Sequence, residues 1–148
     1  MAVTVRRPAE GDRAAWEVLY AGYAEFYRVT QTPEMRAQVW GWIFDPAHET
    51  EALVAEDAGG RLLGLAHFRA FARPLSASTG GFLDDLFVAP AARGQAVADA
   101  LIAALAEEGR ARGWTVIRWI TADDNYRARA VYDRMAERTK WLTYDIRL

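Results

Sequence analysis

Short runs of alternating apolar and polar residues predict strands along most of the chain. Residues 3–6 alternate in this way and stop before Pro8, which has no N–H group to donate to a sheet. The other strand-like runs cover residues 51–57, 61–71, 82–88, 114–121 and 140–148. Residues 58–60, which end in a pair of glycines, predict a hairpin turn between the first two of these runs.

Between the strands, apolar residues recur three and four positions apart, and this spacing predicts amphipathic helices. The helices cover roughly residues 12–27, 32–45, 98–112 and 126–137. Thr32 and Pro33 favour a helix start, and Gly113 favours a helix end. The predicted order is β-α-α-β-β-β-α-β-α-β. It indicates a single α/β (α+β) domain over residues 1–148, with helices flanking a mixed central sheet.

The composition mainly excludes certain classes of partner and of chemical site. With 148 residues, of which 52% are hydrophobic, the chain is long enough for one domain with a sizeable core. A formal net charge of −2 gives no electrostatic footprint for nucleic acid. The chain contains no cysteine, which excludes disulfides, thiolate metal sites and an acyl-cysteine intermediate. We expect no metal, nucleic acid or membrane as partner, and a cytoplasmic location.

The stretch from Phe82 to Ala98 carries the first candidate site, because an apolar strand, a turn and a helix start follow one another there. The first N–H groups of a helix lack internal partners and lie at the positive end of its dipole. Small side chains would let a phosphate approach them, and Arg93 adds a fork of donors. An ordinary β–α connection is the alternative that the spacing leaves open. The polar residues 73–81 predict a loop at the rim of a pocket.

The same stretch resembles the acetyl-CoA-binding signature of the GNAT acyltransferase family. The family form is Arg-Gly-x-Gly-x-Gly or Arg-Gly-x-Gly-x-Ala, and here Ala96 replaces a glycine while Ala98 is an accepted variant. The resemblance implies a GNAT fold and acetyl-CoA as cosubstrate. It also implies that the pyrophosphate lies on Arg93, Gly94, Gln95, Ala96, Val97 and Ala98, and that the backbone of Leu86, Phe87 and Val88 holds the pantetheine arm.

A second group of residues, Asn125, Ala128 and Tyr132, falls on one face of the last predicted helix. A helix cap, a packed alanine and a half-buried tyrosine would satisfy the same spacing. The family resemblance implies instead that Asn125 and Ala128 contact the cofactor and that Tyr132 is the general acid at the thioester sulfur. A phenol can supply that proton without carrying charge at neutral pH.

Asp84 and Asp85 are adjacent carboxylates in an apolar strand, where an unpaired buried charge is costly. One could be exposed while the other pairs with an arginine. Alternatively, at least one faces the acceptor pocket and either binds a cationic amine or takes its proton through water. An alkyl ammonium, with a pKa of about 10.4, must lose a proton before it attacks a thioester. His67 is a further candidate base, although strand histidines are more often packed or hydrogen-bonded.

A narrower resemblance, to the yeast Hpa2/Hpa3-type and diamine acetyltransferase branch, covers residues 82–88 and 119–139. It implies a small amine substrate and a homodimer. In this family the first two helices wall the acceptor site, so some aromatic residues of 20–27 and 40–44 are expected to line it and to attract a cation.

We therefore predict acetyl transfer from acetyl-CoA to a small primary amine by direct attack in a ternary complex. Two alternatives stay open. Ala96 favours a non-catalytic CoA-binding module, against which the Asn125 and Tyr132 pair argues. A protein lysine or N-terminus is the other possible acceptor, although the near-neutral charge gives no sign of a polypeptide-binding surface.

Overall fold

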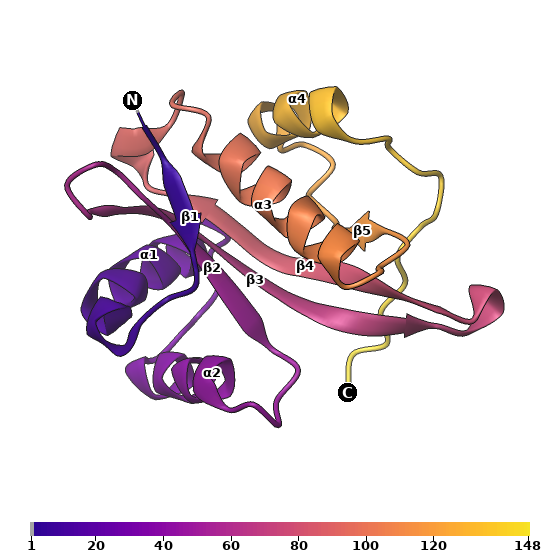
Figure 1. Cartoon of the computed structure of the whole chain (residues 1–148), viewed down its shortest axis with the longest axis horizontal. Helices are drawn as coiled ribbons and strands as arrows, with labels where there is room; N and C mark the ends of the chain where they lie inside the picture. Colours follow the sequence, from indigo (N-terminus) through magenta and orange to yellow (C-terminus); the bar gives the residue numbers. More distant parts are fainter. Residues whose placement is uncertain (1) are drawn as a thin grey trace.

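A five-stranded sheet organises residues 2–148, which the computed structural model describes (Figure 1). Its strands follow chain order: β1 (Thr4–Arg6), β2 (Glu51–Glu56), β3 (Leu62–Arg73), β4 (Ser78–Val88) and β5 (Ile117–Arg118). The first four pair antiparallel, and β5 pairs parallel to β4. The helices are α1 (Arg13–Phe26), α2 (Pro33–Phe44), α3 (Val97–Ala111) and α4 (Tyr126–Met135). The predicted mixed sheet with flanking helices is confirmed.

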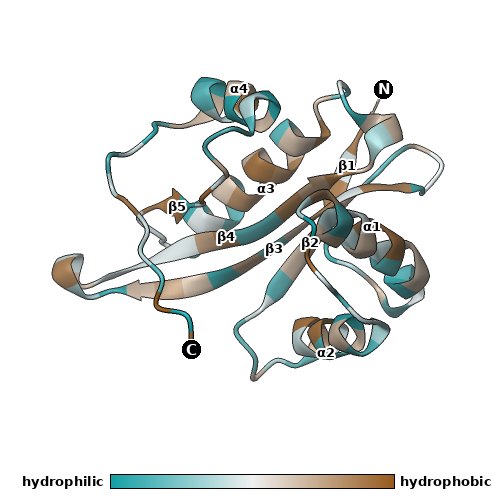
Figure 2. Ribbon diagram, turned by 180° about the vertical axis from the view of Figure 1, so that it is seen from behind, coloured by the Kyte–Doolittle hydropathy of each residue, from teal (hydrophilic) through white to brown (hydrophobic). Residues whose placement is uncertain are grey.

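Two apolar cores lie on opposite faces of the sheet. On one face α3 packs through Leu101 and Leu105, which are fully buried, against Phe68 of β3. On the other face Trp16 of α1 and Trp40 of α2 cover Leu65. Figure 2 shows apolar residues concentrated in the sheet and in α3, and polar residues over much of α4. No helix in residues 2–148 is both long and apolar enough to cross a bilayer.

A β-bulge in β4 opens the sheet at the candidate site. His67 pairs with Asp85 and Phe68 pairs with Leu83, so Asp84 is an extra residue between them. A bulge bends its strand and increases the local twist. The pairing of β4 with β5 covers only Gly81 and Phe82. Beyond Phe82, β4 therefore has no strand partner on this side within residues 2–148, and this part of β4 includes Leu86, Phe87 and Val88, which were predicted to hold the cofactor.

Three sequence expectations need correction. Residues 140–148 form no strand, and the apolar side chains there are exposed, with Tyr144 at 87% and Ile146 at 88%. Strand β5 is only two residues long, so the sheet offers little edge for a further strand within residues 2–148. The strand predicted over 114–121 is shortened to Ile117–Arg118, since only Gly81 and Phe82 of β4 pair with this segment. Residues 73–81 are the end of a long β3–β4 hairpin and not a pocket rim (Figure 1).

Candidate active site

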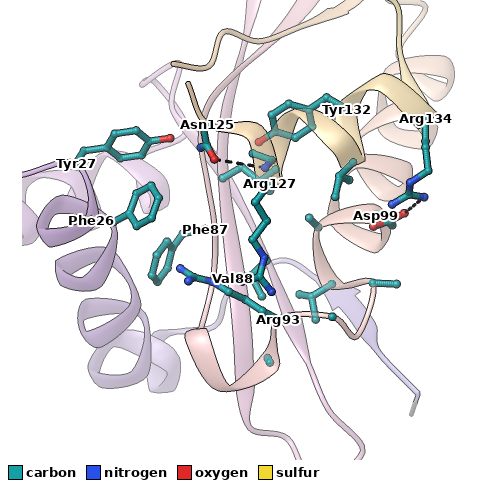
Figure 3. A pocket seen from close by; sticks show the side chains of 18 residues that line it. Phe26, Tyr27, Phe87, Val88, Arg93, Asp99, Asn125, Arg127, Tyr132 and Arg134 are labelled. Atoms are coloured by element: carbon teal, nitrogen blue, oxygen red, sulfur yellow. Dashed lines mark hydrogen bonds and ion pairs between the residues drawn. The ribbon is translucent and has the colours of Figure 1, made fainter. Parts of the chain in front are cut away.

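A cavity of about 460 Å³ opens between the end of β4, the start of α3, α4 and the end of α1 (Figure 3). Most of the predicted cofactor-binding residues line it: Leu86, Phe87, Val88, Arg93, Gly94, Ala96, Val97, Ala98, Asn125 and Ala128. Tyr132 lines it too. Gln95 does not, since it is exposed at the outside of the turn. We refer to this cavity as the cofactor pocket.

The turn before α3 presents backbone to the cofactor pocket. Gly94 (φ 84°) and Ala96 (φ 58°) both adopt left-handed conformations, and no side chain caps α3 at Ala96. The first N–H groups of α3 therefore remain available to an anion. Position 96 requires a conformation that glycine adopts freely and alanine does not, which explains the glycine in the family signature. The left-handed conformation of Ala96 therefore costs about 1–2 kcal/mol of backbone strain.

Arginines surround the cofactor pocket. The Arg93 guanidinium lies 5.7 Å from the ring centroid of Phe26 and 6.0 Å from that of Phe87. Arg127 reaches from α4 toward the segment that carries Arg93, and Arg134 pairs with Asp99 at 3.3 Å (Figure 3). Like charges that converge on one cavity favour a polyanionic ligand. The open turn, the free helix start and these arginines fit the phosphates of acetyl-CoA.

Sequence reasoning did not assign several residues that line this pocket to cofactor binding: Phe26, Tyr27, Ala92, Asp99, Arg127, Val131 and Arg134. A signal was available for three of them. Arg127, Val131 and Arg134 recur three and four apart, and they share a face with the predicted Ala128 and Tyr132. Phe26 and Tyr27 come from α1, and only the fold brings that helix to the pocket.

Tyr132 and Asn125 project from α4 toward the cavity (Figure 3). The Tyr132 ring packs edge-on against Trp119 with centroids 5.4 Å apart. Burial raises the pKa of Tyr132 to about 12, so its phenol stays protonated at neutral pH. Asn125 caps α4, because its Oδ1 accepts a hydrogen bond from the Ala128 N–H at 3.4 Å. The helix cap that the sequence left open as an alternative is therefore present at the Asn125 oxygen. The residue also lines the pocket.

Asp85 belongs to a buried polar cluster on the α1 side of the sheet. Its Oδ2 lies 2.8 Å from His67 Nδ1 and accepts a hydrogen bond from the Tyr20 hydroxyl at 3.0 Å. The Trp16 Nε1–H donates to His67 Nε2 at 3.0 Å. We call Trp16, Tyr20, His67 and Asp85 the Asp85 cluster. Burial opposes ionisation of Asp85, but the hydrogen bonds from His67 and Tyr20 outweigh it and hold its pKa below the usual value.

Asp84 has a different environment from its neighbour. Its side chain is 39% exposed and pairs with Arg69 at 3.1 Å. Burial raises its pKa, although Arg69 acts in the opposite direction. Neither aspartate lines the cofactor pocket. The sequence left open that one aspartate is exposed while the other pairs with an arginine, but Asp84 does both, and Asp85 bonds to Tyr20 and His67.

A row of tyrosines on α1 joins the Asp85 cluster to the cofactor pocket. The ring centroids of Tyr20 and Tyr23 are 6.1 Å apart, and those of Tyr23 and Tyr27 are 5.0 Å apart. Tyr20 contacts Asp85, and Tyr27 lines the pocket. Tyr23 packs edge-on to Phe87, which also lines the pocket. The expectation that aromatic residues of the first helix face the acceptor side therefore points to these tyrosines.

The chain is similar to known proteins over nearly its whole length. The acetyltransferase (GNAT) family matches residues 16–136. The D-amino-acid N-acetyltransferase HPA3 of Saccharomyces cerevisiae is 24% identical over 143 residues, which are 96% of this chain and 89% of that protein. This relative confirms the predicted likeness to the Hpa3-type branch.

Solved structures share the fold. A ribosomal-protein-alanine N-acetyltransferase from Brucella melitensis biovar Abortus 2308 is 25% identical, with a TM-score of 0.83 over 100% of both chains. The aminoglycoside N-acetyltransferase AAC(6')-Iy, in complex with CoA, is 20% identical, with a TM-score of 0.83 over 99% of this chain and 95% of that one. The family match, the yeast relative and the geometry of the pocket agree, and the chain belongs to the acetyltransferase (GNAT) family as an acetyl-CoA-dependent N-acyltransferase.

Proposed function

We propose that the enzyme acetylates a small cationic amine. The observation that carries the proposal is Asp85, an ionised carboxylate whose side chain is 21% exposed at the end of the tyrosine row that leads to the cofactor pocket. An ammonium group gains both charge pairing with such a carboxylate and cation–π contact with the adjacent rings. The yeast relative, whose name states a D-amino-acid substrate, supports an amine of this size.

In this proposal each residue has a limited task. When bound, acetyl-CoA supplies the acetyl group as a thioester, and the phosphates lie on the turn before α3. Asp85 has a lowered pKa, so it attracts the ammonium group strongly but is a weak acceptor for its proton. The role of charge partner is therefore favoured over that of direct base, and the proton that the ammonium group must lose before it attacks leaves through water. Tyr132 holds at its hydroxyl the proton that a departing thiolate needs. Backbone N–H groups of residues 86–88 would polarise the acetyl carbonyl.

The absence of cysteine within the sequence favours direct attack of the amine over an acyl-cysteine route. A ternary complex requires the amine and the thioester to be held together. The tyrosine row and the end of β4 lie between Asp85 and the cavity, and both could contact the two substrates at once. This arrangement supports a ternary complex.

The first test is a pair of measurements on the intact protein. Acetyl-CoA at about 100 times its Kd should stabilise the fold by roughly 2.7 kcal/mol, a rise in Tm of about 5–10 °C. Release of free CoA is then followed with polyamines, D- and L-amino acids, an aminoglycoside and a peptide with a free N-terminus. Turnover of the small amines above the peptide supports the proposal. Binding without any turnover favours the non-catalytic module, and turnover of the peptide alone favours a protein acceptor.

A homodimer and a cytoplasmic location complete the proposal. The segment 140–148 supports a second copy as partner, because alternate apolar side chains along it are exposed: Leu142 77%, Tyr144 87%, Ile146 88% and Leu148 118%. Alternate apolar positions suit a strand that pairs with another chain. Light scattering should give a dimer for the wild type and a monomer for Tyr144→Asp combined with Ile146→Asp. The matched change Val18→Asp, at a residue 74% exposed on α1, should leave the dimer intact. A monomeric wild type would contradict the proposal.

A further inference from the structure

His67 lies at the centre of a chain of hydrogen bonds that the reaction as proposed above does not use. The residue is only 2% exposed, so its polar atoms must find partners within the protein. Both ring nitrogens have one. Nε2 meets the Trp16 indole at 3.0 Å, and Nδ1 meets Asp85 Oδ2 at 2.8 Å.

The identity of these partners determines the tautomer. An indole nitrogen can only donate, so Nε2 of His67 must be the acceptor in its contact with Trp16. A neutral imidazole carries its single proton on the other nitrogen, and Nδ1–H therefore donates to Asp85. A second proton on Nε2 would leave two N–H donors, that of His67 and that of Trp16, facing each other in a buried site. His67 is thus unsuited to be the base that accepts a proton from the substrate.

The two hydrogen bonds to Asp85 converge on one oxygen. His67 Nδ1–H and the Tyr20 hydroxyl both donate to Oδ2. Neither bond uses Oδ1, and the Asp85 side chain keeps 21% of its surface exposed. The titratable groups that face this carboxylate are His67 on β3, Tyr20 and Tyr23 on α1 and the neighbouring Asp84. A carboxylate held through one oxygen presents the other in a defined direction.

We infer that Trp16 and His67 are positioning residues for the amine: Trp16 selects the Nδ1–H tautomer of His67, and that tautomer orients Asp85 so that Oδ1 meets the ammonium group. The inference rests on the proposed function for its ligand, and on the hydrogen-bond geometry alone for its mechanism. It predicts that substitutions of two buried residues outside the cofactor pocket alter the affinity for the amine and leave acetyl-CoA binding unchanged.

The tautomer can be measured without activity, by nitrogen NMR of protein labelled at histidine. The wild type should show a protonated Nδ1 and a bare Nε2 at His67. Trp16→Phe removes the indole donor and should abolish this preference. Trp40→Phe is the matched control, because Trp40 packs against the Trp16 ring at 4.9 Å but donates no hydrogen bond to His67 within residues 2–148. A protonated Nε2 in the wild type, or no change in Trp16→Phe, would overturn the inference.

Kinetics then separate a positioning role from mere packing. His67→Leu removes the donor to Asp85 and should raise the KM for the amine about tenfold, with the Kd for acetyl-CoA unchanged. His67→Asn restores an N–H near the place of Nδ1 and should stay within about twofold of the wild type. If His67 had a purely structural role, the KM for the amine would rise in both variants in proportion to their loss of stability. Equal KM values in His67→Leu and His67→Asn would therefore contradict the inference.

Failure of the proposed function gives a different result. If the wild type binds acetyl-CoA but acetylates no amine, the proposed function fails, and carbon NMR titration of the Asp85 carboxyl replaces KM. His67→Leu should then raise the pKa of Asp85, and His67→Asn should not. An unchanged pKa in both variants would show that His67 does not govern this carboxylate, whatever the substrate is.

Discussion

The cofactor pocket and the Asp85 cluster lie on two sides of the end of β4, and they are built differently. Backbone shapes the pocket: a turn with left-handed residues at Gly94 and Ala96, the free start of α3, and the end of β4, which pairs with β3 but not with β5. Side chains shape the cluster, where Trp16, His67 and Asp85 form a continuous hydrogen-bonded chain. Substitutions in the pocket should therefore have graded effects on cofactor binding, whereas substitutions in the cluster should change the affinity for the amine abruptly.

Tyr132 is the exception that would test this comparison most strongly, because its proposed role in the pocket depends on one side-chain proton. Tyr132→Phe should lower kcat about 100-fold, since a general acid contributes about that much or more, and should leave the Kd for acetyl-CoA within about twofold. The two values come from steady-state kinetics and calorimetry. Tyr126→Phe is the control on the same helix, at a residue 72% exposed. Unchanged kcat would remove Tyr132 from the mechanism.

The two neighbouring aspartates provide the next test. Asp85→Asn removes the charge but keeps the shape, and kcat/KM for the amine should fall about 30-fold because a charged hydrogen bond is lost. The affinity for acetyl-CoA should not change. Asp84→Asn is the matched control and should alter kcat/KM by less than about twofold, since Asp84 is exposed and paired with Arg69. Equal losses in both variants would contradict the distinction between them.

Arg93 tests the pocket alone. Arg93→Ala should weaken acetyl-CoA binding about tenfold at low salt and less at high salt, because it removes one charge from a site for phosphates. At saturating cofactor kcat should be retained. Arg61→Ala, at an exposed residue in the β2–β3 turn, should have no effect on the Kd. A salt-independent loss would indicate that Arg93 acts through packing on Phe26 and not through charge.

The pH dependence of stability tests the cluster. Because the pKa of Asp85 is lower in the folded protein than in the unfolded chain, its charge adds stability above the unfolded pKa of about 3.9. This contribution is lost as the pH falls through the lowered, folded pKa. In urea unfolding, the difference between wild type and Asp85→Asn should stay constant from pH 7 to about pH 5 and shrink below about pH 4. A difference that grows on acidification would reverse the assigned direction.

The smallest effect is expected at Ala96. Ala96→Gly relieves a left-handed alanine, worth about 1–2 kcal/mol, against a loss of roughly 0.4–1 kcal/mol from the more flexible unfolded chain. Thermal unfolding should show a rise in Tm of about 2–4 °C. Ala98→Gly, in the first turn of α3, should lower the Tm because it adds flexibility to a helix. A lower Tm in Ala96→Gly would show that the left-handed turn carries no strain.

The pocket was predictable from sequence because it is made of contiguous segments. The strand, turn and helix start of residues 82–98, and the helical spacing of Asn125, Ala128 and Tyr132, specify their local geometry directly. The Asp85 cluster was not predictable in the same way. Trp16 and His67 are 51 residues apart, and His67 and Asp85 are 18 apart. Only the pairing of β3 with β4 and the packing of α1 bring them together.

The terminal segment shows another limit of pattern reading. Alternation over residues 140–148 predicted a strand, but alternation reports the faces of a segment and not whether a partner edge exists. Within residues 2–148 that edge is reduced to Ile117 and Arg118. The strand prediction for residues 140–148 was wrong because this segment has no partner strand within the described residues.

The bulge at Asp84 makes the proposed amine site depend on chain length as well as on residue type. Deletion of Asp84 would keep the pairs of Leu83 with Phe68 and of Asp85 with His67, but it would remove the bulge and with it the bend of β4 before Asp85. Substitution of Asp84 leaves the number of residues, and therefore the bulge, unchanged. In relatives, this position should therefore vary freely in identity while insertions and deletions are rejected.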